Sequence, residues 1–102
     1  MDPYKQIEYE FAEKFYNTQI KYYIGLHYAN DNSFQEAYMI LQSVNHNLEE
    51  TIEFAQKNKL SGQKAKNELK YLEENLMKNL NYLICKCHAK ILQTQHDEFS
   101  KL

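Results

Sequence analysis

The chain has 102 residues, enough for one domain with a single modest hydrophobic core. Its formal net charge of −2 gives no global attraction to nucleic acid or anionic membranes, and no apolar run approaches the ~18–20 residues that a membrane-spanning helix requires. Because the chain has only two Gly and one Pro, we expect a few long helices. It has two Cys separated by one residue, and its start lacks the apolar stretch of a secretion signal. We therefore expect a cytoplasmic protein in a reducing environment.

The first predicted helix begins at Pro3 and ends near Ala29. Asp2 followed by Pro3 is typical of a helix start, because the Asp side chain can cap free N–H groups and Pro needs no helical hydrogen bond. Eight of the fourteen aromatic residues lie within the first 28 positions, more than one helix face can hide. They either fill the core or contact a partner. Four of the chain's aromatic residues fit the core pattern poorly: Tyr4, Tyr9, Tyr71 and Tyr82.

A turn and a second helix follow. Residues 30–33 have the composition of a turn, since Asn and Asp tolerate left-handed backbone geometry. The second helix is predicted from Phe34 to about Lys57, with Ser33 as its N-cap and Glu36 completing a capping box. The next break falls at residues 60–62.

The spacing of small residues links the first two helices. Gly25 lies twelve residues before Ala37, and large side chains surround both. This pattern is typical of a tetratricopeptide unit, whose paired helices approach closely only where side chains are small. We therefore expect Gly25 and Ala37 to mark the helix crossing. Three large residues are expected in the core beside it: Tyr28, Phe34 and Leu41. A single unit cannot bury its apolar face alone, so the pair needs a third helix or a partner.

The third predicted helix, about residues 63–95, is the most regular. Its apolar positions step by 3-4-4-3-4-4, a repeat of about 3.67 residues per turn that keeps one side of a straight helix apolar. These positions are Leu69, Leu72, Leu76, Leu80, Leu83, Cys87 and Ile91. We expect this stripe to pack against the first two helices, and residues 97–102 to form a frayed tail. The prediction is a single all-α domain (residues 1–102) of three long antiparallel helices, the first two forming a tetratricopeptide-like hairpin.

Residue patterns for catalysis or metal binding are weak. A zinc site could be considered at Cys85, Cys87 and His88, because Cys and His are zinc ligands. However, Cys85 and Cys87 are two residues apart on a helix, so their side chains project about 200° apart and do not converge on one ion. The sequence has no nucleophile elbow or phosphate-binding loop, and two Gly in total leave little for a phosphate cradle. We therefore expect no metal, no cofactor and no enzymatic activity.

Charge is sorted along the chain. Residues 31–53 contain five acids and no Lys, whereas residues 59–90 contain seven Lys and three Glu. The second and third helices could attract each other across solvent, although exposed ion pairs contribute only ~0–1 kcal/mol each. The Lys residues of the third helix also leave open an RNA-contacting domain, although the chain lacks Arg, the residue better suited to bidentate phosphate contact.

Four segments together resemble one family. They are the stretch from Phe34 to Val44, the downstream Glu53-Phe54-Ala55, Glu68-Leu-Lys-Tyr-Leu, and Ile84-Cys-Lys-Cys-His-Ala-Lys-Ile-Leu. Over about residues 20–95 the chain is similar to the C-terminal protein-binding region of the 68-kilodalton subunit of the signal recognition particle. In that family a degenerate tetratricopeptide-like pair precedes a long helix that ends in a Cys-x-x-x-Ala-x-Ile-Leu-like stretch. Here those places are held by Cys85, Ala89, Ile91 and Leu92.

The resemblance implies a non-catalytic module that forms a heterodimer with the tetratricopeptide-repeat 72-kilodalton subunit of the same particle, which targets proteins co-translationally. It implies only indirect contact with RNA, because the family's RNA-binding domain lies N-terminal to this region. The chain departs from the usual repeat residues at Lys21, Asn32 and Glu49, which favours a single degenerate unit capped by the third helix.

The residues expected to bind this partner lie on the third helix and its C-terminal end, with one aromatic residue from the first helix. They are Tyr82, Ile84, Cys85, Ile91, Leu92 and Tyr9. Two alternatives remain: an RNA-contacting helical domain that uses the Lys residues of the third helix, and a homodimeric helical adaptor that closes over its own seam.

Overall fold

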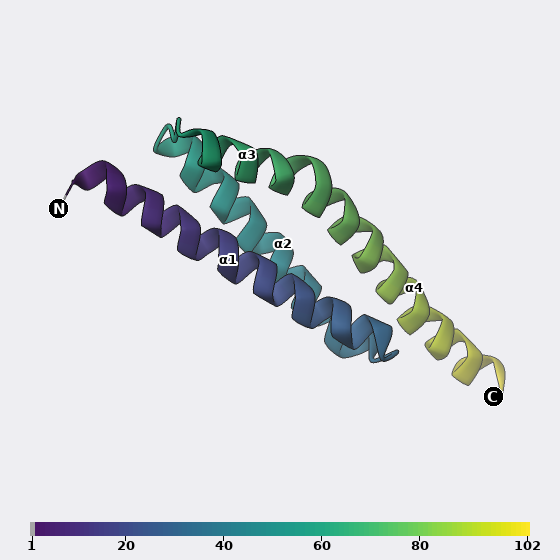
Figure 1. Cartoon of the computed structure of the whole chain (residues 1–102). Coiled ribbons are helices and arrows are strands. Elements are labelled where there is room, and N and C mark those ends of the chain that lie inside the picture. The colour runs from purple at the N-terminus through teal and green to yellow at the C-terminus, as the bar shows by residue number, and fades with distance from the viewer. Residues whose placement is uncertain (1) are drawn as a thin grey trace.

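The computed structural model describes residues 2–102 and confirms the expected all-α fold of three long helices. Helices α1 (Pro3–Asn30) and α2 (Phe34–Lys57) form an antiparallel hairpin. The third helix consists of α3 (Gln63–Tyr71), a π-helical turn η1 (Leu72–Leu76) and α4 (Met77–Ser100), which follow one another without a break. It packs mainly on α2. Figure 1 shows the end of α4 extending past the α1–α2 turn.

The start of α1 is capped as the sequence predicts. The Asp2 side chain accepts a hydrogen bond from the backbone N–H of Tyr4 at 3.0 Å, and Pro3 is the first helical residue. The Tyr4 hydroxyl also lies 3.4 Å from Oγ of Ser61, which links this end of α1 to the turn between α2 and α3.

Helix α2 begins at Phe34 and ends at Lys57 as predicted, with Ser33 at the N-cap position, but the predicted capping bonds do not form. Asn32 has a φ of 62°, the left-handed geometry expected in the turn. Ser33, however, makes no side-chain capping bond. Its backbone N–H donates to the Tyr28 carbonyl at 2.9 Å, and its ψ of 70° is not the extended geometry of a capping residue. The predicted capping box with Glu36 is therefore wrong.

Helices α1 and α2 approach closely at Gly25. A Cβ atom placed on Gly25 would lie 2.6 Å from Cδ2 of Leu41, so only a residue without a side chain permits this approach. Ala37 and Leu41 are fully buried, and Phe34 packs at the edge of the core. Tyr28, expected in this core, is instead 36% exposed. It lies three residues after Gly25, which turns it about 60° around the helix from the crossing.

The predicted stripe of the third helix is buried along its middle. Its two ends, Leu69 and Ile91, are half-buried. Five residues between them are buried: Leu72, Leu76, Leu80, Leu83 and Cys87. They complete a core to which α1 contributes aromatic rings and α2 contributes aliphatic side chains.

The apolar spacing does not predict the π-helical turn η1. A π-helical turn holds about one residue more than an α-helical turn, so it rotates the residues before it relative to those after it. Tyr71, just before the turn, faces α1, where its ring centroid lies 6.3 Å from that of Phe15. Leu72 and Leu76 within the turn remain in the core. The turn therefore brings Tyr71 toward α1, while α3 and α4 each contact both α1 and α2 and α4 packs mainly on α2.

The third helix is longer than predicted. It ends at Ser100 and not near Gln95, so residues 97–100 are helical and the predicted frayed tail is shorter. Residues 92–100 contain neither Gly nor Pro, so nothing in the local sequence stops the helix. Every residue after Ile91 is exposed, so this end of α4 buries no side chain, although Thr94, Gln95 and Glu98 border a depression shared with residues 32–36.

Candidate protein-binding surfaces

Helix α1 carries apolar side chains on two opposite faces. One face is buried in the bundle and includes Phe11, Phe15, Tyr22 and Gly25. The opposite face holds five large residues with exposed fractions of 44–67%, which we name the α1 outer stripe: Tyr9, Tyr16, Ile20, Tyr23 and Ile24. At about 100° per residue these side chains lie on the side of α1 opposite its buried face, with Tyr9 at the edge of the cavity toward α3 and Ile24 at the edge toward α2. Folding of this bundle does not bury them.

The exposed apolar surface continues from α1 onto α2. Ile24 borders two shallow depressions, one lined by Ile20, Tyr23 and Tyr28 and the other reaching Met39 of α2. Met39 is itself 72% exposed. The α1–α2 hairpin is therefore covered by the third helix on one side and presents a continuous apolar surface on another.

Helix α4 also has an apolar face that points away from the core. Six residues step by 3-4-3-4-3 along it, and we name them the α4 seam: Tyr82, Cys85, Ala89, Leu92, His96 and Phe99. All six are exposed. At about 100° per residue they lie on the side of the helix opposite Leu80, Leu83 and Cys87. This spacing is that of a coiled-coil interface.

The structure divides the six predicted partner-binding residues into three groups. The first group shares the α4 seam: Tyr82, Cys85 and Leu92. Ile84 and Ile91 are half-buried closer to the core. Tyr9 lies on α1 beside α3, whereas Ile91 lies beside the start of α2, so the two are at opposite ends of the bundle. The predicted set does not form one surface.

The sequence-based set omits seven residues of these two surfaces: Tyr16, Ile20, Tyr23, Ile24, Ala89, His96 and Phe99. Ile20 and Ile24 repeat the helical spacing of Tyr16, so a count of apolar residues on both faces of α1 finds them. Phe99 completes the 3-4-3-4-3 spacing, but this becomes visible only when the helix continues to Ser100.

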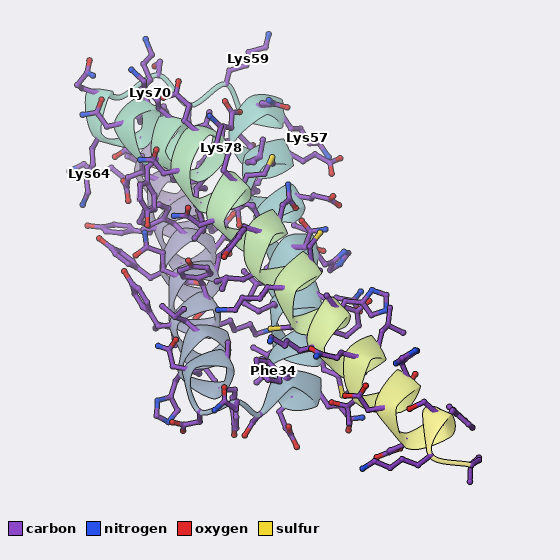
Figure 2. All side chains as sticks on the ribbon, turned by 90° about the vertical axis from the view of Figure 1, so that its right-hand side faces the viewer. Phe34, Lys57, Lys59, Lys64, Lys70 and Lys78 are labelled. Carbon is purple, nitrogen blue, oxygen red and sulfur yellow. The ribbon has the colours of Figure 1, made fainter. Side chains whose placement is uncertain are left out.

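The Lys residues do not form a single track. Figure 2 shows Lys57, Lys59, Lys64, Lys70 and Lys78 around the end of the molecule where α2 meets α3, pointing in several directions. The ion pairs among residues 2–102 all join a His to an acid, and all are exposed. The sorted charges of α2 and the third helix therefore do not meet in ion pairs.

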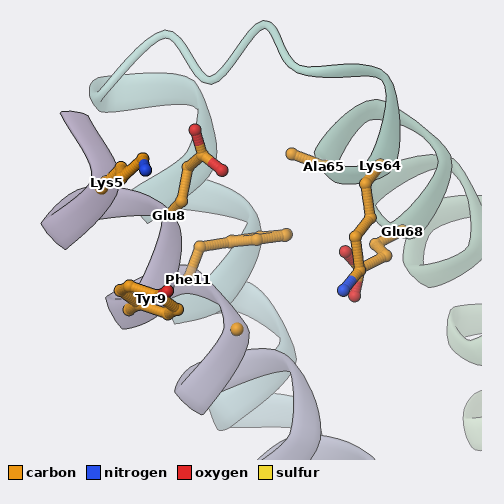
Figure 3. A pocket seen from close by; sticks show the side chains of 8 residues that line it. Lys5, Glu8, Tyr9, Phe11, Lys64, Ala65 and Glu68 are labelled. Carbon is orange, nitrogen blue, oxygen red and sulfur yellow. The ribbon is translucent and has the colours of Figure 1, made fainter.

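A cavity of about 200 Å³ opens between α1 and α3. Figure 3 shows Phe11 reaching from α1 toward α3, with Lys64 and Glu68 on the α3 side. Burial raises the pKa of Glu68, and the positive charge of Lys64 opposes this shift. The eight residues that line the cavity include no Cys, Ser or His, so it offers no nucleophile paired with a histidine base.

The two cysteines lie on different sides of α4. Cys87 is fully buried, and burial raises the pKa of its thiol, whereas Cys85 is exposed. The His88 ring stacks on Tyr38 of α2 with ring centroids 5.0 Å apart. Within residues 2–102, no group of three or more His, Cys, Asp or Glu side chains is arranged to hold a metal ion.

Comparison with protein-family models, with curated proteins and with solved structures finds no match for this chain. None of the helices in residues 2–102 combines the length and the apolar character needed to cross a membrane. The molecule is a three-helix bundle with two exposed apolar surfaces, one on the α1–α2 hairpin and one on α4.

Proposed function

We propose that this chain is a non-catalytic helical interaction module whose α1 outer stripe binds another protein. The α1 outer stripe itself carries the proposal, because its five large apolar residues lie exposed on the face opposite the core. Single apolar residues are common on protein surfaces, but a continuous apolar surface is typical of an interaction site. Tyr suits such a surface, since its ring is apolar and its hydroxyl can still form hydrogen bonds.

The favoured partner is the tetratricopeptide-repeat 72-kilodalton subunit of the signal recognition particle. This choice rests on the sequence resemblance over about residues 20–95. It is physically reasonable, because repeat proteins stack helical hairpins into concave surfaces that accept a helix. From Tyr9 to Ile24 the α1 outer stripe is about 22 Å long at 1.5 Å per residue, a length that several helical turns of a partner can cover. The module would then act in the cytoplasm and meet RNA only through the particle.

Binding to the purified 72-kilodalton subunit tests this proposal. The double variant Ile20→Asp, Tyr23→Ala should weaken binding at least about tenfold, because truncated interface aromatics often cost ~2 kcal/mol or more. Both side chains are exposed, so circular dichroism should show an unchanged helix content. Gln35→Asp adds the same charge at an exposed position of α2 and should leave binding unchanged.

A second variant compares the two surfaces. Tyr82→Ala with Leu92→Ala removes exposed apolar side chains from α4 and not from α1. Loss of binding in this variant alone, with the α1 variant binding normally, would assign the partner to α4 and reject the α1 outer stripe. Normal binding by both variants would reject this partner for either surface.

Salt dependence separates this proposal from an RNA-contacting domain. Binding through phosphate contacts weakens steeply between low and physiological salt, whereas a mostly apolar protein interface barely responds. Titrations of the 72-kilodalton subunit and of RNA over the same salt range provide the comparison. Tight RNA binding with a steep salt dependence would favour the Lys residues of α3 and α4 over the α1 outer stripe.

A further inference from the structure

We propose that the α4 seam pairs with the same seam of a second copy of this chain, with the two α4 helices antiparallel. The seam lies on a different helix from the α1 outer stripe, so this pairing does not depend on the partner proposed above. Four features of α4 support it: the exposure of its end, the direction of the seam, the side chains that would meet, and the charges beside them.

The end of α4 buries no side chain in the core. Residues 92–100 are helical but all exposed, and Figures 1 and 2 both show this end extending past the α1–α2 turn. Short isolated helices are marginal in water, since most helix stability in proteins comes from packing of an apolar face. Leu92 and Phe99, 49% and 71% exposed, are available for such packing. A second helix along the seam would supply it.

The seam is accessible to a second helix. It follows the 3.5-residue repeat that keeps a stripe in contact with a neighbouring helix. The buried stripe of α4, represented by Leu80 and Leu83, faces the opposite side. An approaching α4 helix therefore reaches the seam without meeting α1 or α2 of the first copy.

The side chains of the seam complement one another when the helices are antiparallel. Placing the two-fold axis between Ala89 and Leu92 brings each residue opposite a different one. Three facing pairs result, each occurring twice: Tyr82 with Phe99, Cys85 with His96, and Ala89 with Leu92. The first pair stacks ring on ring, and the third places a small side chain against a large one, as packed helices require.

A parallel arrangement is less favourable. Each residue would then face its own copy, so Ala89 would meet Ala89 and leave a gap. His96 would meet His96, which brings two like-charged rings together when they are protonated. The dipoles of two adjacent helices also attract each other when the helices are antiparallel and repel each other when they are parallel.

The residues beside the seam raise no charge repulsion in the antiparallel arrangement. Flanking positions on the two copies would pair as Lys86 with Gln93, His88 with Gln95, Asn79 with Ser100, and Asn81 with Leu102. Each pair contains at most one ionisable side chain, so no like charges meet. The seam itself contains neither Lys nor Arg, which disfavours a nucleic acid as its occupant.

Sedimentation analysis over a concentration series tests the pairing. The wild-type mass should rise from one chain to two as concentration increases from low micromolar to millimolar. Leu92→Glu and, independently, Phe99→Glu should keep the mass of one chain throughout. Both positions are exposed, so helix content should not change. Met39→Glu changes an apolar residue outside the seam that is as exposed as Phe99, and it should dimerise as the wild type does.

Cross-linking tests the antiparallel orientation. In His96→Cys the introduced thiol should face Cys85 of the second copy, and oxidised glutathione should join positions 85 and 96 of different chains. Mass spectrometry of the linked peptides identifies the positions. A disulfide joining Cys85 to Cys85 would overturn the antiparallel arrangement. A wild-type chain that stays single at every concentration, or a dimer unaffected by Leu92→Glu and Phe99→Glu but lost in Ile20→Asp, would overturn the seam itself.

Discussion

Gly25 determines how closely α1 and α2 approach each other. Any side chain at this position would occupy the space of Leu41, because a Cβ atom on Gly25 would lie within 2.9 Å of both Cγ and Cδ2 of that residue. Leu41 is fully buried, so it has little room to move aside. The close contact of the two helices therefore depends on the absence of one Cβ atom.

Gly25→Leu should reduce the free energy of unfolding by about 1–3 kcal/mol or more, because the extra atoms overpack the crossing. Urea denaturation followed by circular dichroism measures this change. Gly62→Ser is a suitable control, since a Cβ there would meet only the Tyr4 hydroxyl at 3.8 Å, and a hydroxyl at this N-cap position should add a few tenths of a kcal/mol. Equal stability of Gly25→Leu and wild type would show that the helices do not cross at Gly25.

A buried pair of threonines also lies between α1 and α2. Thr18 and Thr51 are almost completely buried, with Oγ1 atoms 3.3 Å apart. Each hydroxyl donates at 2.7 Å to the carbonyl four residues earlier in its own helix, Lys14 for Thr18 and Asn47 for Thr51. Because each helix satisfies its own hydroxyl, this polar contact costs little in the core.

The third helix acts as one element despite the π-helical turn. Its buried residues continue from Leu72 in the turn to Cys87 in α4, all facing the α1–α2 hairpin. The turn changes the direction of the residues before it, which is why Tyr71 reaches Phe15 of α1. Both α3 and α4 contact both helices of the hairpin.

Leu80→Ala should reduce the free energy of unfolding by about 2–5 kcal/mol, because a fully buried Leu leaves a cavity when it is truncated. Lys78→Ala, on the exposed face of the same helix, should change it by less than about 0.5 kcal/mol. Chemical denaturation of both variants gives the comparison. A loss below about 1 kcal/mol for Leu80→Ala would mean that α4 does not seal the core.

The molecule is elongated because its helices are long and the end of α4 extends beyond the hairpin. Its principal extents are 64 × 21 × 19 Å, and its Cα radius of gyration is 16.9 Å. A compact domain of 100 residues has a radius of gyration of about 13 Å. The elongated shape leaves much surface for contacts with other chains.

Small-angle X-ray scattering at low concentration should give a radius of gyration close to the 16.9 Å of the single chain. The radius of gyration should increase with concentration if two α4 helices pair in antiparallel orientation, because the two bundles then lie at opposite ends of the paired α4 seams. A value near ~13 Å in dilute solution would contradict the elongated arrangement of the helices.

The order, number and approximate ends of the helices follow from the sequence alone. They depend on local features, namely the spacing of apolar residues, the scarcity of Gly and Pro, and the turn composition of residues 30–33 and 60–62. The same reasoning correctly placed Asp2 at the N-cap of α1 and Ser33 at the N-cap of α2, but it did not predict that the Ser33 side chain makes no capping bond, because that depends on the geometry of the turn.

Which face of α1 is buried was decided only by the tertiary structure. Both faces of α1 are rich in large apolar side chains, and nothing local distinguishes the face of Phe15 from that of Tyr16. The packing of α2 and the third helix against one side makes Phe15 part of the core and leaves Tyr16 exposed. The same packing separates Tyr9 from Leu92, because the distance between two surfaces depends on how whole helices are arranged and not on residue spacing within any one of them.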